Sequence, residues 1–331
     1  MQCAENQLAS ERPTACLNTI GEAVLPALKQ TPSGIVAARF ERCAYLEFNN
    51  EWLCLALQDL GAGPTVLQLD SAVTQLHNTL QVGTPVRFDT HRFILIGDYT
   101  VDTHGASAYS GMLGTSCIDR RRVYRWSRVL QNNCMRVGLA PLFRQNDFSI
   151  LNSKPWNSIS TKLNSKQIKA APIGSAPVNV QESELLAYVA PAIQALLDWV
   201  RDSVVLKVQT NPPVIIRKLL GAGPGLTPSG DDFLAGVLCA LHLSGNHQAM
   251  HRLSAVLLDN VLDATSPVSA SLLKQACDGR INEHAQQLVQ CVLLSPSVDA
   301  GALLACVERM GASSGWDFLT GLVLGVLACQ V

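Results

Sequence analysis

The sequence has almost no net charge, and this excludes several classes of partner. Its 331 residues include 25 Lys and Arg against 26 Asp and Glu, which gives a formal net charge of −1 at pH 7. Proteins that bind nucleic acid or anionic membranes through their overall charge are strongly basic. We therefore predict neither a nucleic-acid partner nor a membrane partner.

The sequence also lacks the patterns of a secretory signal, a membrane span and a cysteine-based site. MQCAENQLASERP, at the N-terminus, has no basic segment followed by an apolar one, and the longest apolar run is shorter than the ~20 residues that a membrane span requires. The 11 cysteines are odd in number, form no C-x-x-C pair and in several cases lie inside apolar runs such as GVLCAL. These features predict a cytoplasmic protein with buried thiols, without disulfides and without a metal site.

The hydrophobic patterning predicts an α+β protein. From Gly34 to Asp98, short apolar runs such as GIVAARF, AYLEF and RFILIG alternate with turn residues, which predicts five or six short antiparallel strands. Residues 119–137 change to a helical period. We predict a small antiparallel β-sheet or barrel, closed by this helix, over residues 34–148, and an N-terminal extension over 1–33.

The second half of the chain is expected to be helical. Residues 149–183 are rich in Ser, Asn, Lys and Pro and show no steady period, so they are predicted to be a linker or a long surface excursion. From residue 184 to 331 no strand pattern remains, which predicts an all-helical domain. Its helices are expected over 184–205, 212–220, 231–244, 248–263, 268–278, 283–294, 299–310 and 316–329.

A glycine-rich stretch, GAGPGLTPSGDDFLAGVL at residues 221–238, precedes one of these helices. The spacing of Gly225 and Gly230 equals that of a P-loop, but Asp231 and Asp232 stand where a P-loop needs Lys and Ser or Thr. A dinucleotide-binding turn needs a preceding strand, whereas NPPVIIRKLLG is typical of a short helix. We therefore predict no nucleotide cofactor, and no other cofactor.

The same stretch also fits a purely structural interpretation. Ser229 and Asp232 have the spacing of a capping box, which stabilises a helix start by about 1 kcal/mol. SSGWDFLTGLVLGV, at residues 313–326, repeats the pattern of PSGDDFLAGVLCAL at 228–241. A glycine inside a helix costs about 1 kcal/mol relative to alanine. Gly236 and Gly321 therefore predict that the two helix starts pack closely against each other or against a ligand.

The residues found only in the first copy of this repeat are the better candidates for function. They are Gly223, Pro224, Gly225, Thr227 and Asp231. A glycine-rich helix start favours an anionic group, and an aspartate favours an N–H donor. Carbamoyl and amide compounds offer both.

Three other groups of residues have both functional and structural interpretations. Arg120, Arg121, Arg122, Arg125 and Arg128 form either an anion clamp or the solvated face of a helix. His247 and His251 have the spacing of a zinc helix but lack its glutamate, so no metal is predicted. Thr265, Ser266 and Ser269 either cap a helix or join a polar pocket near Asp232.

Together with TSPVSASLLKQACDG and SSGWDFLTGLVLG, the glycine-rich stretch resembles the AllH-like family over about residues 220–326. That family is named for the oxamate carbamoyltransferase subunit of anaerobic allantoin degradation. The predicted extension and the insert at 150–182 depart from the family pattern. The residues that match its signature are Gly223, Gly225, Thr227, Ser229, Gly230, Asp231, Asp232, Ser269, Ser314, Gly315 and Asp317.

The resemblance implies a subunit that works with an FdrA-like, acyl-CoA-synthetase-type subunit and a third subunit. Together they convert oxalurate and phosphate into oxamate and carbamoyl phosphate. In this hypothesis, backbone N–H groups of Gly225 to Gly230 hold an anionic oxygen, while Asp231 or Asp232 accepts from the substrate NH2 group and acts as a base. The alternative is a non-catalytic scaffold, or a subunit that senses small carboxylates, in which the motif packs helices.

Overall fold

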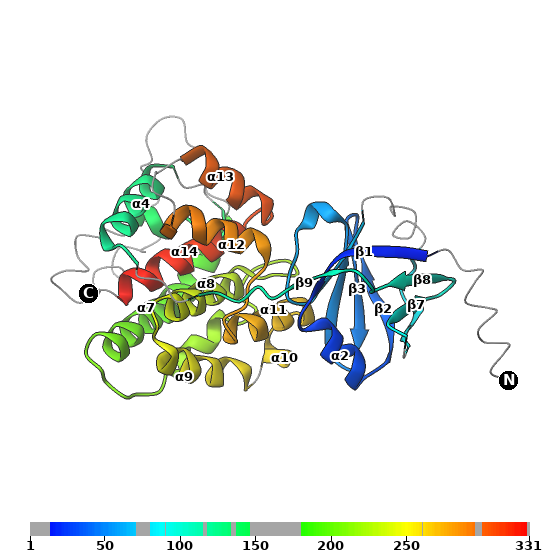
Figure 1. Ribbon diagram of the computed structural model, residues 1–331. Coiled ribbons are helices and arrows are strands. Elements are labelled where there is room, and N and C mark those ends of the chain that lie inside the picture. The colour runs from blue at the N-terminus through cyan, green and yellow to red at the C-terminus, as the bar shows by residue number, and fades with distance from the viewer. Residues whose placement is uncertain are drawn as a thin grey trace. The chain divides into compact units, whose positions relative to one another are not determined.

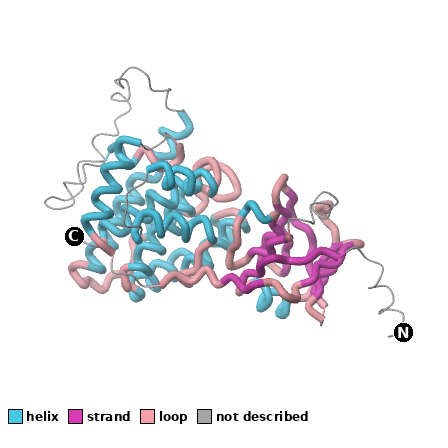
Figure 2. The backbone as a smooth tube through the Cα atoms, turned by 45° about the horizontal axis from the view of Figure 1, so that its top comes forward, coloured by secondary structure: helices cyan, strands magenta, loops and turns pink. Residues whose placement is uncertain are grey.

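A computed structural model describes residues 14–70, 80–89, 91–114, 118–133, 137–145, 180–259, 261–294 and 300–329. The chain forms two compact units. Unit 1 comprises Met1–Met112 and Arg280–Glu283, and unit 2 comprises Leu113–Gly279 and His284–Val331. Figure 2 shows the strands in unit 1 and a set of packed helices in unit 2. The predicted α+β class, with a β-rich first part and a helical second part, is confirmed.

Unit 1 is a sheet that closes on itself. Its strands follow the order β5-β4-β3-β2-β6-β7-β8-β1-β9, and an additional pairing of β5 with β1 closes eight of them into a barrel. The elements are β1 (Thr14–Gly21), α2 (Val24–Gln30), β2 (Ser33–Arg39), β3 (Cys43–Phe48), β4 (Glu51–Ala56), η1 (Gln58–Leu60), β5 (Val66–Leu69), β6 (Pro85–Phe88), β7 (Phe93–Ile96), β8 (Tyr99–Asp102) and β9 (Ser107–Tyr109).

The barrel core follows from the alternation of side chains along each strand. Successive side chains of a strand point to opposite faces. In β3, Leu46 and Phe48 are buried while Tyr45 and Glu47, which alternate with them, are partly exposed, and in β4 Leu53 and Leu55 are buried in the same way. The apolar face of each strand therefore lines one core.

Three features of unit 1 differ from the expectation. The sheet is mixed, because β1 pairs with β8 and β9 in parallel and β4 pairs with β5 in parallel. It also begins at Thr14, within the stretch expected to be an extension. Helix α4 (Arg120–Asn133), expected to close the first domain, is part of unit 2. Register with distant strands decides such pairings, and a single strand's pattern does not contain it.

Unit 2 contains the helices α4, α5 (Leu142–Gln145), α7 (Val180–Val204), η4 (Val214–Leu219), α8 (Ser229–Leu243), α9 (His247–Leu258), α10 (Val261–Ala264), α11 (Pro267–Cys277), α12 (Glu283–Val289), η5 (Gln290–Leu294), α13 (Ala300–Arg309) and α14 (Ser314–Ala328). Helix α14 is buried from Gly315 to Ala328, as expected of a helix that is apolar on all sides. It lies beside α8 in the centre of this unit (Figure 1).

The helices expected from residue 184 onward are present, with shifted ends. Helix α7 begins at Val180, four residues before the expected start. The predicted linker at 149–183 lies outside the described residues up to 179. Among the described residues, no helix combines the length and the apolar character needed to cross a membrane.

Candidate functional site

Helices α8 and α14 cross in backbone contact at the two glycines of the repeat. A Cβ atom on Gly236 would stand 2.2 Å from the carbonyl oxygen of Phe318, and one on Gly321 would stand 2.0 Å from that of Phe233. These contacts are reciprocal, because Gly236 and Phe233 occupy the same positions in the first copy as Gly321 and Phe318 in the second. The predicted close packing of the two helix starts against each other is confirmed.

The predicted capping box is wrong. Helix α8 is capped by Pro228 without a side-chain hydrogen bond, and Ser229 is already its first helical residue. The N–H groups of Asp231 and Asp232 donate to the carbonyl oxygen of Pro228, at 2.9 and 3.2 Å. Ser313 caps α14, also without a side-chain bond. The aspartate side chains are thus available for other contacts.

Asp231 ties three segments of unit 2 together. The N–H group of Gly221 donates to its Oδ1 at 3.0 Å. The hydroxyls of Thr265 and Ser269 both donate to its Oδ2, the latter at 2.7 Å. Burial raises the pKa of Asp231, and these three hydrogen bonds oppose the shift. A buried carboxylate whose two oxygens are both engaged in this way acts as a structural link.

Asp232 makes contacts of a different kind, because its partners come from both copies of the repeat. The hydroxyls of Ser314 and Thr227 lie within hydrogen-bond reach of its carboxyl group. These hydroxyl oxygens lie 2.9 Å from each other. Oδ2 of Asp232 is buried and has no hydrogen-bond partner among the described residues. Asp232 is thus a buried acid with spare capacity to bind or exchange a proton.

The pKa of Asp232 also differs from that of an ordinary surface aspartate. Burial holds the pKa of Asp232 well above its ordinary value, and the carboxylates of Asp317 and Asp231 raise it further, while the two hydroxyls lower it. Asp317, the equivalent residue of α14, is fully buried and accepts from the N–H group of Leu139 at 2.6 Å. Two buried carboxyl groups therefore lie near the crossing of the repeat helices.

A cavity of about 610 Å3 opens at these helix starts. It is lined from the glycine-rich loop by Gly223 and Pro224, from α8 by Ser229 and from the start of α14 by Ser313. Its remaining walls are mainly apolar and include Tyr188 of α7. The full set of lining residues is Val137, Gly138, Glu184, Leu185, Tyr188, Gly223, Pro224, Ser229, Ala312 and Ser313.

Two positively polarised helix ends, those of α8 and α14, begin at this cavity. A helix N-terminus carries roughly half a positive charge, which favours anions. Of the backbone donors expected to hold the anion, the N–H of Gly230 instead donates to the carbonyl oxygen of Ala222 at 2.8 Å. The next two N–H groups, those of Asp231 and Asp232, donate to the carbonyl oxygen of Pro228. The hydroxyls of Ser229 and Ser313, the carboxylate of Glu184 and the two helix dipoles remain as the polar features of the cavity.

The other candidate residues divide between this site and structural positions. Gly223 and Gly225 have φ values of 119° and 93° and shape the loop. Gly315 packs against the carbonyl of Val307, and Ser269 belongs to the Asp231 network. Ser266 caps α11 by accepting from the N–H of Ser269, as one interpretation of the sequence predicted.

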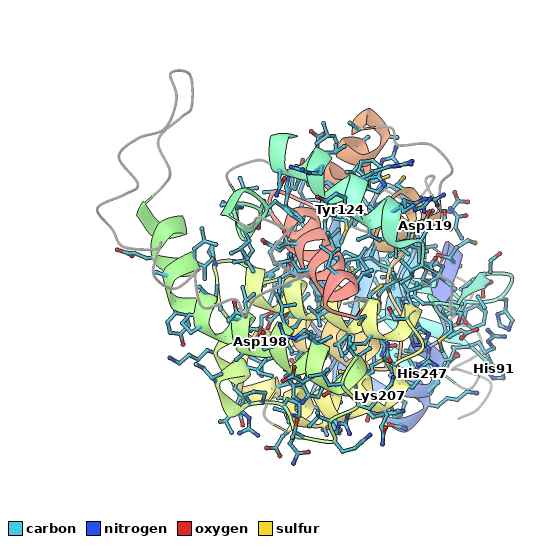
Figure 3. The ribbon with its side chains drawn as sticks, turned by 90° about the vertical axis from the view of Figure 1, so that its left-hand side faces the viewer. His91, Asp119, Tyr124, Asp198, Lys207 and His247 are labelled. Atoms are coloured by element: carbon cyan, nitrogen blue, oxygen red, sulfur yellow. The ribbon has the colours of Figure 1, made fainter. Side chains whose placement is uncertain are left out.

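The arginine helix α4 is not part of the cavity lining. Its Val123, Trp126 and Leu130 are buried. Arg122 donates to the carbonyl of Leu293 at 2.8 Å, and Arg128 lies over the ring of Tyr124. Figure 3 labels Asp119, just before this helix, and Tyr124 on it. Among the described residues, no arginine lines the cavity, so α4 presents a solvated face there.

The histidine pair is also separate from the cavity. His247 packs its ring against that of His242, with the centroids 5.2 Å apart. No cluster of three or more His, Cys, Asp or Glu suited to a metal ion occurs within the described part of the chain.

Sequence reasoning missed the wall formed by α7. Glu184, Leu185 and Tyr188 lie at the first described turns of that helix and carry no motif. The one available signal is Tyr188, a large aromatic residue that is 53% exposed.

The pKa of Asp232 predicts a pH-dependent stability. A carboxyl group whose pKa is raised in the folded state stabilises the fold below its unfolded pKa, and this contribution is lost as the pH rises through the folded pKa. From about pH 4 upward, Asp232 is expected to lower the free energy of unfolding by up to about 1.4 kcal/mol per pH unit until the folded pKa is reached. Asp232→Asn should remove this slope.

Urea unfolding of the full chain between about pH 4 and pH 8 measures the slope. Asp263→Asn, at an exposed position of α10, is the control and should keep the wild-type slope. Parallel profiles for Asp232→Asn and the wild type would contradict the raised pKa.

Comparison with known proteins agrees with the resemblance of the glycine-rich stretch. No solved structure matches the chain significantly. Residues 219–326 match the family described as "Oxamate carbamoyltransferase subunit AllH", and this segment contains α8, α14 and both copies of the repeat. Over residues 219–326, the chain is thus similar to the AllH subunit of an oxamate carbamoyltransferase.

Proposed function

We propose that this chain is a substrate-binding subunit of a carbamoyltransferase that interconverts oxalurate plus phosphate with oxamate plus carbamoyl phosphate. The cavity at the starts of α8 and α14 is the observation that carries this proposal, because part of its lining, Gly223, Pro224, Ser229, Ala312 and Ser313, belongs to the matched family segment. All four compounds are small anions. Two helix N-termini and two serine hydroxyls suit their carboxylate and phosphate oxygens.

Asp232 is the acid that we assign to the chemistry, and Asp231 is not. Asp231 already accepts from Gly221, Thr265 and Ser269, so a substrate NH2 group would compete with these internal donors. Asp232 keeps one oxygen without a partner among the described residues. That oxygen is suited to accept from a carbamoyl or amide NH2 group, or to take up a proton.

The remaining subunits of the proposed enzyme are an FdrA-like, acyl-CoA-synthetase-type subunit and a third subunit. The name of the matched family supports the view that the chain works as one subunit of several. The competing function is a scaffold in which the repeat only packs helices. The structural role of Asp231 is consistent with a scaffold. A scaffold would not require a cavity at the helix starts, however.

Filling the cavity tests the proposal. Ala312 is exposed and lines the cavity, so Ala312→Trp is expected to occupy it without disturbing the core. Binding of oxamate and carbamoyl phosphate to the full chain, measured by calorimetry, should weaken at least about tenfold. Phosphate-dependent breakdown of oxalurate by the reassembled complex should fall in parallel.

Ala305→Trp is the matched control, because Ala305 is an exposed alanine of α13 outside the cavity lining. It should leave both binding and turnover at wild-type values. If Ala312→Trp bound and turned over substrate as well as the wild type, the cavity would not be the substrate site. If the wild-type chain gave no binding heat and the complex no turnover, the scaffold function would be favoured.

A further inference from the structure

Three side chains from the two copies of the repeat form one hydrogen-bonded group. The hydroxyls of Thr227 and Ser314 lie 2.9 Å apart, and both lie within hydrogen-bond reach of the carboxyl group of Asp232. Oδ2 of Asp232 is buried and without a partner among the described residues. Ser314 is partly exposed and directly follows Ala312 and Ser313, which line the cavity. A hydroxyl held by a carboxylate beside a cavity is the arrangement of an activated nucleophile.

We propose that Ser314 is a nucleophile that receives the carbamoyl group, with the carboxylate of Asp232 as its base. This inference rests on the proposed function, and it adds a covalent intermediate to it. The structure offers a second candidate hydroxyl, that of Thr227, but Thr227 lies in the loop before α8. Ser314 is the first residue of α14, where the helix dipole stabilises developing negative charge on its oxygen.

The first half of the reaction removes oxamate. Oγ of Ser314 attacks the carbamoyl carbon of oxalurate, and the bond from that carbon to the nitrogen of the oxamate portion breaks. The hydroxyl proton passes to Asp232 and from there to the departing nitrogen, which leaves as the NH2 group of oxamate. A carbamoyl ester of Ser314 remains, and the number of electrons on each side is unchanged.

The second half releases carbamoyl phosphate. An oxygen of hydrogen phosphate attacks the carbon of the carbamoyl ester, and the ester bond to Oγ of Ser314 breaks. The phosphate proton passes through Asp232 to Oγ, which restores the hydroxyl. Both halves use the same carboxylate as proton carrier, so Asp232 needs an oxygen that is free to exchange a proton.

Electrostatics and packing support this assignment. The raised pKa of Asp232 makes its carboxylate a stronger base than an exposed aspartate. The close contacts at Gly236 and Gly321 bring the start of α14 against α8, so the nucleophile of one copy meets the base of the other. Asp317, the equivalent of Asp232 in the second copy, instead accepts from the N–H group of Leu139 at 2.6 Å.

Isotope exchange in the reassembled complex distinguishes a covalent intermediate from direct transfer. With a carbamoyl ester, labelled oxamate should enter oxalurate in the absence of phosphate, because the first half-reaction is reversible. Peptide mass spectrometry of the quenched complex should find one carbamoyl group on the peptide containing Ser314. Ser314→Ala should lower exchange and overall turnover at least about 10³-fold.

Two further variants test the rest of the group. Thr227→Val is expected to slow the exchange and Thr227→Ser to restore it, since a hydroxyl at residue 227 holds that of Ser314. Ser244→Ala, at the other end of α8, is the control and should exchange at the wild-type rate.

The outcomes separate this inference from the proposed function. If the wild-type complex forms carbamoyl phosphate but shows no exchange without phosphate, or if Ser314→Ala keeps full turnover, transfer is direct and the nucleophile is overturned while the proposed function stands. A wild-type complex without carbamoyl transfer overturns both. Exchange together with a carbamoyl group on another residue overturns the assignment to Ser314 alone.

Discussion

Gly321→Val is expected to destabilise unit 2 by about 3 kcal/mol or more, because it forces atoms into a filled core. A Cβ atom at this position would stand 2.0 Å from the carbonyl oxygen and 3.0 Å from the Cα atom of Phe233. These are backbone atoms of α8, so no rotamer change relieves the overlap and the two helices must separate. Phe233 and Phe318 are both almost fully buried, and their packing would be lost with the crossing.

Urea unfolding of the full chain measures this loss as a change in the free energy of unfolding. Valine also has a lower helix propensity than alanine, but this effect is small. The control Ala305→Val, on the exposed face of α13, should therefore lower the free energy of unfolding by less than about 1 kcal/mol. An unchanged urea midpoint for Gly321→Val would mean that α8 and α14 do not cross in backbone contact. Gly236→Val should behave alike, since its Cβ atom would stand 2.2 Å from the carbonyl oxygen of Phe318.

Asp231→Ala is expected to destabilise the chain by about 3 kcal/mol, because three buried or half-buried donors lose their acceptor at once. They are the N–H group of Gly221 and the hydroxyls of Thr265 and Ser269. Asp231→Asn should cost less, because its side-chain oxygen can still accept from Gly221. A urea midpoint that is lowest for Asp231→Ala, higher for Asp231→Asn and highest for the wild type would identify Asp231 as a structural link.

Asp263→Ala is the control for this series, because Asp263 is an exposed aspartate on the neighbouring helix α10 and its loss should cost less than about 0.5 kcal/mol. Equal stability of Asp231→Ala and the wild type, accompanied by loss of turnover, would instead return Asp231 to the catalytic candidates. The contrast with Asp232 is direct, since Asp232→Asn is expected to change the pH dependence of stability and the chemistry.

Much of the helical unit was predictable because its signals are local. Apolar periodicity, and the glycine and proline residues that mark helix ends, can be read from short stretches of sequence. The helices α8, α9, α11, α13 and α14 therefore lie close to their expected ranges. The repeat was visible for the same reason. Its two glycines predicted a close crossing because glycine inside a helix is costly without such a contact.

The pairing of strands was not predictable in the same way. Residues 14–21 were assigned to an extension, yet they form β1, which joins β5, β8 and β9. The parallel pairs depend on strands that are distant in the sequence. Local alternation reports that a strand is half-buried but contains no information about its neighbour.

The aspartates of the glycine-rich stretch show most clearly what the sequence determines and what only the tertiary structure decides. The sequence alone identified Asp231 and Asp232, their place at a helix start and the second copy around Asp317. It named both as catalytic candidates and, because only Asp232 recurs, favoured Asp231 for function and explained Asp232 by the helix cap. In the structure, the hydroxyls of Thr265 and Ser269, from another helix pair, donate to Asp231, while Ser314 of the second copy reaches Asp232. Hydrogen-bond partners 34 to 38 residues away from Asp231 decide whether it is a link, and no spacing within one helix start contains them.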